Sequence, residues 1–285
     1  MKLSVIIPCL DAESTIGIQL EALYRQDWAE PWEVIVSDNG STDKTLEIIE
    51  GYKKKLTNLH IVDSSDRKGV SHARNVGARC AKGESLAFCD ADDEIAPGWV
   101  AAIGEATSKY DFVASRFEMK KLNLKLFYRK HQQETGLSTY GYPPFLSHAG
   151  GSGLAVKRSI HDKTGGFDES MPRLNDTDYC WRIQLKGIKL HFAKDAVVHV
   201  RNRNTLKDNF RQARLWGEYN VFLYKKYLPF GMPKLSWKAG IKSWIRLLMC
   251  ISRILDKENR CSWIFSFGWC VGRLYGSIKY RVLAL

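Results

Sequence analysis

An acidic run begins directly after the apolar residues 86–89 and reads Asp90, Ala91, Asp92, Asp93 and Glu94. The side chains of Asp90 and Asp92 project to the same side of an extended backbone, because alternate residues of a strand share a face. Carboxylates this close repel each other unless a cation binds, and hard oxygen ligands suit Mg²⁺ or Mn²⁺ better than zinc. The run therefore predicts a divalent metal site of the kind that works with a nucleotide substrate. The alternative is an acidic turn that caps a helix over residues 95–107.

A second polar turn follows the strand-like residues 34–37. Asp38, at the end of this segment, is a candidate to accept hydrogen bonds from a base or ribose, as acidic residues do in other doubly wound nucleotide sites. The alternative is an ordinary strand–turn–helix junction, in which Gly40 relieves backbone strain and Ser41 or Thr42 caps the helix.

Arg74 and Asp176 are two further candidates for chemistry. Arg74 lies in the segment 69–77, where its planar guanidinium suits a phosphate or a base carbonyl, and a solvated arginine is the alternative. The segment does not fit the G-x-G-x-x-G fingerprint, which argues against a hydride-transfer enzyme. Asp176 opens a helix predicted over residues 177–185. It is a candidate general base for an acceptor hydroxyl, or otherwise a helix cap.

The elements that must position these residues follow an alternating pattern. Strands are predicted at residues 3–7, 34–37, 59–62, 86–89 and 112–115, with helices at 14–24 and 42–52. Such alternation predicts an α/β fold with a mainly parallel sheet, helices on both faces, and ligands at the carboxyl ends of the strands. Residues 116–150 are predicted to form a loop-rich excursion, followed by strands at 153–156, 190–193 and 196–200.

The remaining part of the chain, residues 205–285, is basic and helical. It contains 15 Lys or Arg against 4 Asp or Glu and so carries nearly all of the net charge of +12. One helical stripe of apolar residues runs through Trp237, Ile241, Trp244, Ile245, Leu248, Ile251 and Leu255. We predict a basic amphipathic extension that lies on a membrane surface, and no transmembrane helix. A solvated helical face that covers the core is the alternative.

Composition limits the class of protein further. With 285 residues and 45% hydrophobic content the chain can bury a sizeable core, which excludes a disordered or fibrous protein. Its seven cysteines are an odd number and include no C-x-x-C pair, which favours a reducing compartment.

Taken in this order, the four polar segments resemble those of the family 2 glycosyltransferases, inverting enzymes with the Rossmann-like GT-A fold. The resemblance covers about residues 3–217. It implies that the nucleotide sugar contacts Pro8, Asp11, Asp38, Arg74, Asp90 and Ala91. Pro8 and Asp11 stand in the family's Pro-x-aromatic-Asn pattern, although Leu10 replaces the aromatic residue.

The same resemblance implies the roles of the catalytic and metal-binding residues. Asp90 and Asp92 match the metal motif, and His199 stands where several GT-A enzymes place a further metal ligand. Asp176 matches the family's base aspartate, although the preceding position is Asn175 where the family has Glu. The implied cofactor is Mn²⁺ or Mg²⁺.

The resemblance implies transfer of a sugar from a nucleotide diphosphate donor, expected to be a UDP-sugar, to a hydroxyl of a glycan or lipid-linked glycan in surface polysaccharide assembly. We expect a GT-A domain over residues 1–204, with a donor half at 1–115 and an acceptor half at 116–204, then the helical region 205–285. The expected location is cytoplasmic and peripheral on the inner face of the cell membrane.

Two other classes of function are open to the same features. A metal-dependent nucleotidyltransferase is one, but residues 8–16 lack the Gly-rich basic loop that such enzymes carry for a triphosphate. An RNA-binding module that uses the basic tail is the other. Because the tail's charge is mostly helical and outside the α/β body, nucleic acid is not the expected partner.

Overall fold

The computed structural model describes residues 1–140 and 145–284, which form two compact units. The sheet unit contains residues 1–118, 131–138 and 147–201. The helical unit contains residues 119–130, 139–140, 145–146 and 202–284. Residues 116–140 and 145–150 hold the end of one strand and two short 3₁₀ turns, and the rest of the predicted excursion, at 141–144, lies outside the described residues.

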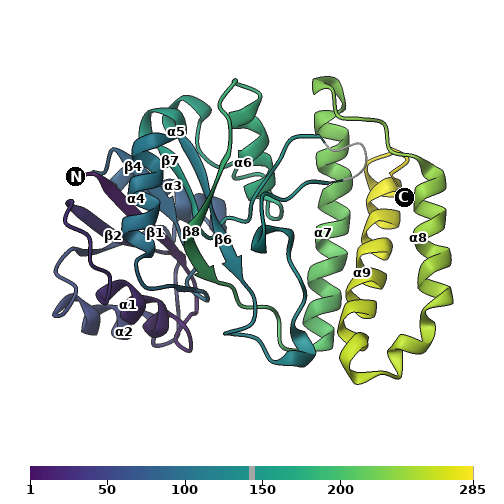
Figure 1. The fold of residues 1–285 in the computed structure, drawn as a ribbon, viewed down its shortest axis with the longest axis horizontal. Coiled ribbons are helices and arrows are strands. Elements are labelled where there is room, and N and C mark those ends of the chain that lie inside the picture. Colours follow the sequence, from purple (N-terminus) through teal and green to yellow (C-terminus); the bar gives the residue numbers. More distant parts are fainter. Residues whose placement is uncertain (141–144, 285) are drawn as a thin grey trace. The chain divides into compact units, whose positions relative to one another are not determined.

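The sheet unit is built on one eight-stranded sheet (Figure 1). From edge to edge the order is β3 (Leu59–Asp63), β2 (Trp32–Asp38), β1 (Leu3–Cys9), β4 (Ser85–Phe88), β7 (Leu154–Lys157), β6 (Phe112–Glu118), β8 (His191–His199) and β5 (Glu94–Ile95). Neighbouring strands from β3 to β4 are parallel, as are β6 and β8, whereas β7 and β5 are antiparallel to their neighbours. The expected α/β architecture is confirmed, with a mixed sheet.

Helices cover both faces of this sheet, and the side of each follows from connection handedness. The crossovers α1 (Ile16–Tyr24) and α2 (Thr45–Lys53) share one face, because both carry the chain outward from β1. The return through α3 (Val70–Cys80) uses the opposite face. Helix α4 (Trp99–Lys109) lies on the same face as α1 and α2. Helices α5 (Arg158–Thr164) and α6 (Asn175–Gln184) lie on the same face as α3 (Figure 1).

The core lies on both sides of the central strands. All seven residues of β1 are buried, as expected for a parallel strand covered by helices on both faces. On the α3 side, Phe88 meets Phe167 edge to face, and Phe167 stacks on Tyr179 with ring centroids 4.1 Å apart. On the other side, the indole of Trp99 donates to Ser115 Oγ at 2.9 Å. The two aromatic layers fix α6 and α4 against the sheet.

Several predicted boundaries were wrong, mostly at helix starts. Helix α1 begins at Ile16 rather than at residue 14, and its N-cap Thr15 makes no capping bond through its side chain. Helix α2 begins at Thr45 after Lys44, and neither Ser41 nor Thr42 caps it. Asp43 instead accepts hydrogen bonds from the amide and hydroxyl of Thr45. Each candidate had an adequate side chain, and only the path of the turn decided which one was used.

Later elements also differ from the predicted ones. Residues 94–95 pair with β8 as strand β5, so the predicted helix at 95–107 begins only at Trp99. The strands predicted at 190–193 and 196–200 are one strand, β8, whose pairing with β6 shifts register between Ser115 and Arg116. Helix α6 begins at Asn175, with Leu174 in the left-handed conformation as N-cap. Neither Asp176 nor Thr177 is therefore the cap.

The helical unit contains α7 (Leu206–Tyr227), α8 (Trp237–Met249) and α9 (Lys257–Lys279) (Figure 1). Helices α7 and α9 pack through glycines: a Cβ at Gly268, Gly272 or Gly276 would meet the carbonyl oxygen of Phe210, Arg214 or Glu218. The three glycines are four residues apart and so share one face of α9. In the part of the chain that the structure describes, no helix combines the length and hydropathy needed to span a bilayer.

The glycine seam gives a first prediction, on stability. Gly272→Ala places a Cβ against the backbone of α7, which cannot move aside as a side chain can, and should cost about 2 kcal/mol of unfolding free energy. Gly51→Ala is the matched control in α2, where a Cβ meets nothing within 4 Å, and should gain about 0.5–1 kcal/mol. Urea unfolding followed by tryptophan fluorescence measures both. Equal stability of the two variants would contradict the tight seam.

Candidate active site

The sequence-predicted acids gather at one edge of the sheet because their strands run the same way. Strands β1, β2 and β4 are parallel, so the residues after each of them lie at a shared carboxyl edge. Strand β7 is antiparallel to both β4 and β6, and β8 is parallel to β6, so β6 and β8 run in the same direction as β4. The edge therefore collects Asp11, Asp38, Asp90 and His199, which come from four separate strands.

Three carboxylates form an acidic cluster at this edge: Asp90, Asp92 and Asp93. One ligand oxygen of each lies within 4.8 Å of the others. Asp93 is buried, and its Oδ1 accepts a hydrogen bond from the amide of Arg201 at 2.9 Å. Burial, together with the negative charges of Asp92 and Asp90, raises the pKa of Asp93 well above its usual range. The cluster is thus an electrostatically costly arrangement that a cation would relieve.

The donor set of the acidic cluster fits a hard divalent cation. All three groups supply oxygen, the ligand type of Mg²⁺ and Mn²⁺. Asp90 Oδ1 is held by Arg74, and its other oxygen accepts no hydrogen bond from the described residues. His199 is not part of the cluster, and its Nδ1 lies 2.8 Å from Glu118 Oε2. Its role as a metal ligand stays a prediction.

Arg74 connects the acidic cluster to helix α6. Its side chain is only 4% exposed. One terminal nitrogen, Nη2, donates to Asp90 Oδ1 at 2.6 Å, and the other, Nη1, donates to Asn175 Oδ1 at 3.0 Å. The guanidinium carbon lies 5.1 Å from the centroid of the Phe167 ring. The planar fork therefore reaches two separate elements with fixed geometry, whereas a lysine would present only a point charge on a flexible stem.

Asp176 lies next to this link at the start of α6. Its Oδ2 accepts a hydrogen bond from the amide of Gly151 at 3.0 Å, and its Oδ1 accepts one from the amide of Thr177 at 2.7 Å. Burial raises the pKa of Asp176, and the positive charge of Arg74 partly opposes that change. A carboxylate with a raised pKa is a stronger base, so the position suits a group that removes a proton.

Asp38 is largely occupied by its own turn. Its carboxylate accepts hydrogen bonds from the amide of Gly40 at 3.1 Å and from the amide and hydroxyl of Ser41. Asp38 therefore has the structural role of holding the strand–turn–helix junction. It also lies at the strand edge where a nucleoside is expected. Its contact with a base stays a prediction.

Pro8, Asp11 and Ala91 occupy different environments around this edge. Asp11 has a positive φ of 46°, and its Oδ1 accepts a hydrogen bond from the amide of Thr42 at 2.8 Å, which joins the loops after β1 and β2. Pro8 is buried inside β1, and Ala91 is buried within the acidic run. The contacts of Pro8 and Ala91 with a donor stay predictions.

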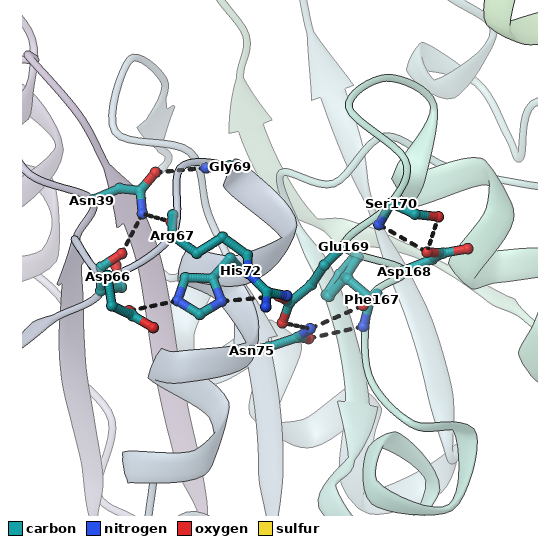
Figure 2. Close-up of polar contacts among 11 residues, drawn as sticks. Asn39, Asp66, Arg67, Gly69, His72, Asn75, Phe167, Asp168, Glu169 and Ser170 are labelled. Atoms are coloured by element: carbon teal, nitrogen blue, oxygen red, sulfur yellow. Dashed lines mark hydrogen bonds and ion pairs between the residues drawn. The ribbon is translucent and has the colours of Figure 1, made fainter.

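Sequence reasoning missed a polar network behind the site, which Figure 2 shows. His72 in α3 lies between two carboxylates, with Nδ1 3.0 Å from Glu169 and Nε2 2.8 Å from Asp66. These partners raise the pKa of His72 against the opposing effect of burial. Glu169 also accepts from Arg67 at 2.8 Å and from Asn75 at 2.9 Å. The network ties the loop before α3 to the loop before α6.

The same network extends to the end of β2. The side chain of Asn39 donates to the carbonyls of Ser64 and Arg67, and its oxygen accepts from the amide of Gly69 (Figure 2). Glu169 belongs to the Gly-Gly-Phe-Asp-Glu segment 165–169, whose polar end was the available signal in the sequence. Its partners are about a hundred residues away in the chain, so sequence alone could not identify them.

The Arg74 link gives a prediction on stability. Arg74→Met leaves the buried Asn175 and the partly exposed Asp90 without their donor and should lower the free energy of unfolding by about 1–3 kcal/mol, the usual effect of an unsatisfied buried acceptor. Arg79→Met is the matched control, since Arg79 is exposed on the same helix. Chemical denaturation of both variants measures the difference. Indistinguishable unfolding curves would show that Arg74 does not organise the site.

Comparison with known proteins identifies related chains. TarS of Staphylococcus aureus, a poly(ribitol-phosphate) beta-N-acetylglucosaminyltransferase, is 41% identical over 97 residues, which are 33% of this chain and 17% of TarS. Glycosyltransferase AglE of Haloferax volcanii is 27% identical over 198 residues, 68% of this chain and 65% of AglE. The chain thus spans less than two thirds of the length of these relatives.

Solved structures share the fold at low sequence identity. Mannosyltransferase PcManGT of Pyrobaculum calidifontis, in complex with GDP-Man and Mn²⁺, has a TM-score of 0.67 and 20% identity, covering 96% of this chain and 86% of that one. TarS 1–349 in complex with UDP-GlcNAc has a TM-score of 0.57 and 18% identity, covering 99% and 93%. The fold is that of the GT-A glycosyltransferases.

Family models settle the classification. The model described as glycosyl transferase family group 2 matches residues 125–281. The model described as glycosyl transferase family 2 matches residues 4–164, more than half of the chain. On this match, and with the acidic cluster and Asp176 at the carboxyl edge of such a sheet, the chain belongs to glycosyl transferase family 2.

Proposed function

We propose that this protein transfers a sugar from a nucleotide diphosphate donor to an acceptor hydroxyl, with inversion at the anomeric carbon. The observation that carries the proposal is the joining of the acidic cluster to the base candidate by one buried arginine. Arg74 holds Asp90 through one nitrogen and Asn175, the residue before Asp176, through the other. A metal-binding group and a proton acceptor are thus fixed at the same strand edge.

In the proposed reaction Asp176 removes the proton of the acceptor hydroxyl. The hydroxyl oxygen forms a bond to the anomeric carbon from the side opposite the diphosphate, and the bond from that carbon to the diphosphate oxygen breaks. A single displacement of this kind inverts the anomeric centre. When bound, a divalent cation on Asp90 and Asp92 would supply the positive charge that neutralises the departing nucleoside diphosphate.

Backbone groups around Asp176 hold its carboxylate in place. Hydrogen bonds from the amides of Gly151 and Thr177 fix the direction of its carboxylate. Glycine at position 151 lets the Arg74 guanidinium keep its place, because a Cβ there would displace it. The base and the arginine therefore depend on the same close approach of backbone.

The donor is proposed to be a UDP-sugar, and its proposed contacts are Pro8, Asp11, Asp38, Arg74, Asp90 and Ala91. TarS, whose structure contains UDP-GlcNAc, supports uridine as the nucleoside of the donor. PcManGT in complex with GDP-Man and Mn²⁺ supports a nucleotide-sugar donor that binds together with a metal ion. The side chains of Asp38 and Arg74 are engaged within the protein, so we propose that they present the loop and the acidic cluster to the donor.

The proposed acceptor is a glycan or lipid-linked glycan in surface polysaccharide assembly. Relatives named for transfer to poly(ribitol-phosphate) support a polymeric acceptor. The matching peripheral location is the inner face of the cell membrane, reached through the C-terminal helices. Metal-dependent nucleotidyl transfer is less favoured, because the loop after β1 carries the acids Asp11 and Glu13 where a triphosphate would need basic groups.

The assignment of Asp176 and Asp92 is tested by substitution. Asp176→Asn should lower turnover by about 100- to 10,000-fold, the usual contribution of a general base, and Asp92→Ala should have a comparable effect through lost metal. Asp195→Asn, an exposed acid in β8, is the control. A panel of nucleotide sugars is assayed for hydrolysis and transfer with Mn²⁺, with Mg²⁺ and with chelator. Normal turnover by Asp176→Asn would sink the base assignment.

The raised pKa of Asp176 predicts the acid side of the pH profile. The base works only when deprotonated, so kcat/KM should fall as the pH drops through its pKa. Because burial raises that pKa, the fall should begin at a higher pH than the value of about 3.9 for an exposed aspartate would give. A pH–rate series on the wild type, with unfolding checked at each pH, measures it. A flat profile down to that ordinary value would contradict the prediction.

A further inference from the structure

Helix α8 and the turn after it carry an apolar face that the fold leaves exposed. We define this apolar face as Trp237, Ile241, Ile245, Leu248, Met249, Ile251 and Leu255. Leu255 is 83% exposed and Met249 80%, the highest values among large apolar side chains of the described residues. The first four members recur at intervals of four, four and three residues, so they form one continuous stripe along α8. Isolated exposed leucines are ordinary, but a contiguous stripe marks an interaction surface.

The apolar face is not needed for packing within the helical unit. A neighbouring side of α8, which includes the buried Leu247, meets α9. There the Trp263 indole donates to the carbonyl of Leu247 at 3.0 Å, and Trp244 meets Phe267 edge to face. Helix α8 is thus anchored by one side and presents a second apolar side outward.

Basic residues line one border of the stripe. Three basic residues each come directly after a member of the stripe: Lys238, Lys242 and Arg246. They are four residues apart, so they form a parallel row about 100° further around the helix. None of the three forms an ion pair with a described residue. The sequence contains no acid between Glu218 and Asp256. The border is therefore a row of uncompensated positive charge.

We infer that α8 binds the surface of an anionic phospholipid bilayer, with the apolar face in the acyl boundary and the basic row at the phosphates. The charge row complements anionic lipid and would repel its own copy if a second chain covered the same face. Thirteen residues of helix span about 20 Å, too short to cross the apolar layer, so α8 lies in the plane of the surface. Long basic side chains can keep their charged ends at the phosphates while their stems pack beside the stripe.

This inference deepens the proposed peripheral role by naming the binding face and the lipid chemistry, and it does not depend on the transfer step. A lipid-linked acceptor resides in the bilayer, so binding there would raise the local concentration of acceptor for the enzyme. Vesicle binding and sugar transfer can therefore be measured separately on the same preparation.

The test uses the full chain and flotation with phosphatidylcholine vesicles, with and without phosphatidylglycerol. We expect binding to the anionic vesicles that weakens with salt. Lys238→Gln/Lys242→Gln/Arg246→Gln should bind roughly a hundredfold more weakly, and Ile245→Ser/Leu248→Ser roughly tenfold more weakly. Lys207→Gln and Leu124→Ser are the controls, since both residues are exposed in the same unit outside the apolar face. Circular dichroism checks the folding of every variant.

Three results would overturn the inference. They are no flotation of the wild type, equal flotation with neutral vesicles, and self-association of the wild type that Ile245→Ser/Leu248→Ser abolishes, which would assign the face to a second copy. A chain that turns over donor but does not float overturns only this inference. A chain that floats but never turns over any nucleotide sugar overturns only the proposed function.

Discussion

The buried guanidinium of Arg74 is the interaction on which the site depends. A charge that is almost completely removed from water must find partners of good geometry, and Arg74 finds them in Asp90 and Asn175. Asp90 follows strand β4 and Asn175 begins helix α6, so the two residues are 85 positions apart in the sequence. The requirement to satisfy one cation therefore fixes the distance between the metal-binding loop and the helix of the base candidate. The fork of an arginine can do this because its two terminal nitrogens point in different directions.

Around this link the fold balances negative charge with directed hydrogen bonds. The acidic cluster is held together although its members repel, because the Arg201 amide and Arg74 each hold one of its carboxylates. Behind it, Glu169 gathers the side chains of His72, Asn75 and Arg67 and so fixes the loop before α6. A site that must accept a diphosphate and a cation needs such fixed dipoles before the substrate arrives, since reorganisation at the moment of reaction would raise the barrier.

The helical unit combines a close backbone contact between α7 and α9 with an exposed apolar side of α8. Glycines on α9 let the backbone of α7 approach closely, which replaces side-chain burial by backbone contact along that seam. Helix α8 uses a single side for packing and leaves its second apolar side exposed. Exposed apolar surface is unfavourable in water, so an arrangement that keeps it is explained by a partner that covers it. A basic row beside that surface restricts the partner to one with negative charge.

The sequence by itself determined the α/β alternation, the strand-end position of Asp38 and Asp90, and the basic helical tail, because hydrophobic period and local charge are properties of neighbouring residues. Only the tertiary structure decided which turn residues cap α2 and α6, that β5 and β7 run antiparallel, and that 190–200 is a single strand. The same holds for the partners of Arg74 and Glu169, which lie on distant elements. Those outcomes depend on strand register and on contacts between residues far apart in the chain. Local propensity contains no information about such contacts, so the residues of the site could be named from sequence but their connections could not.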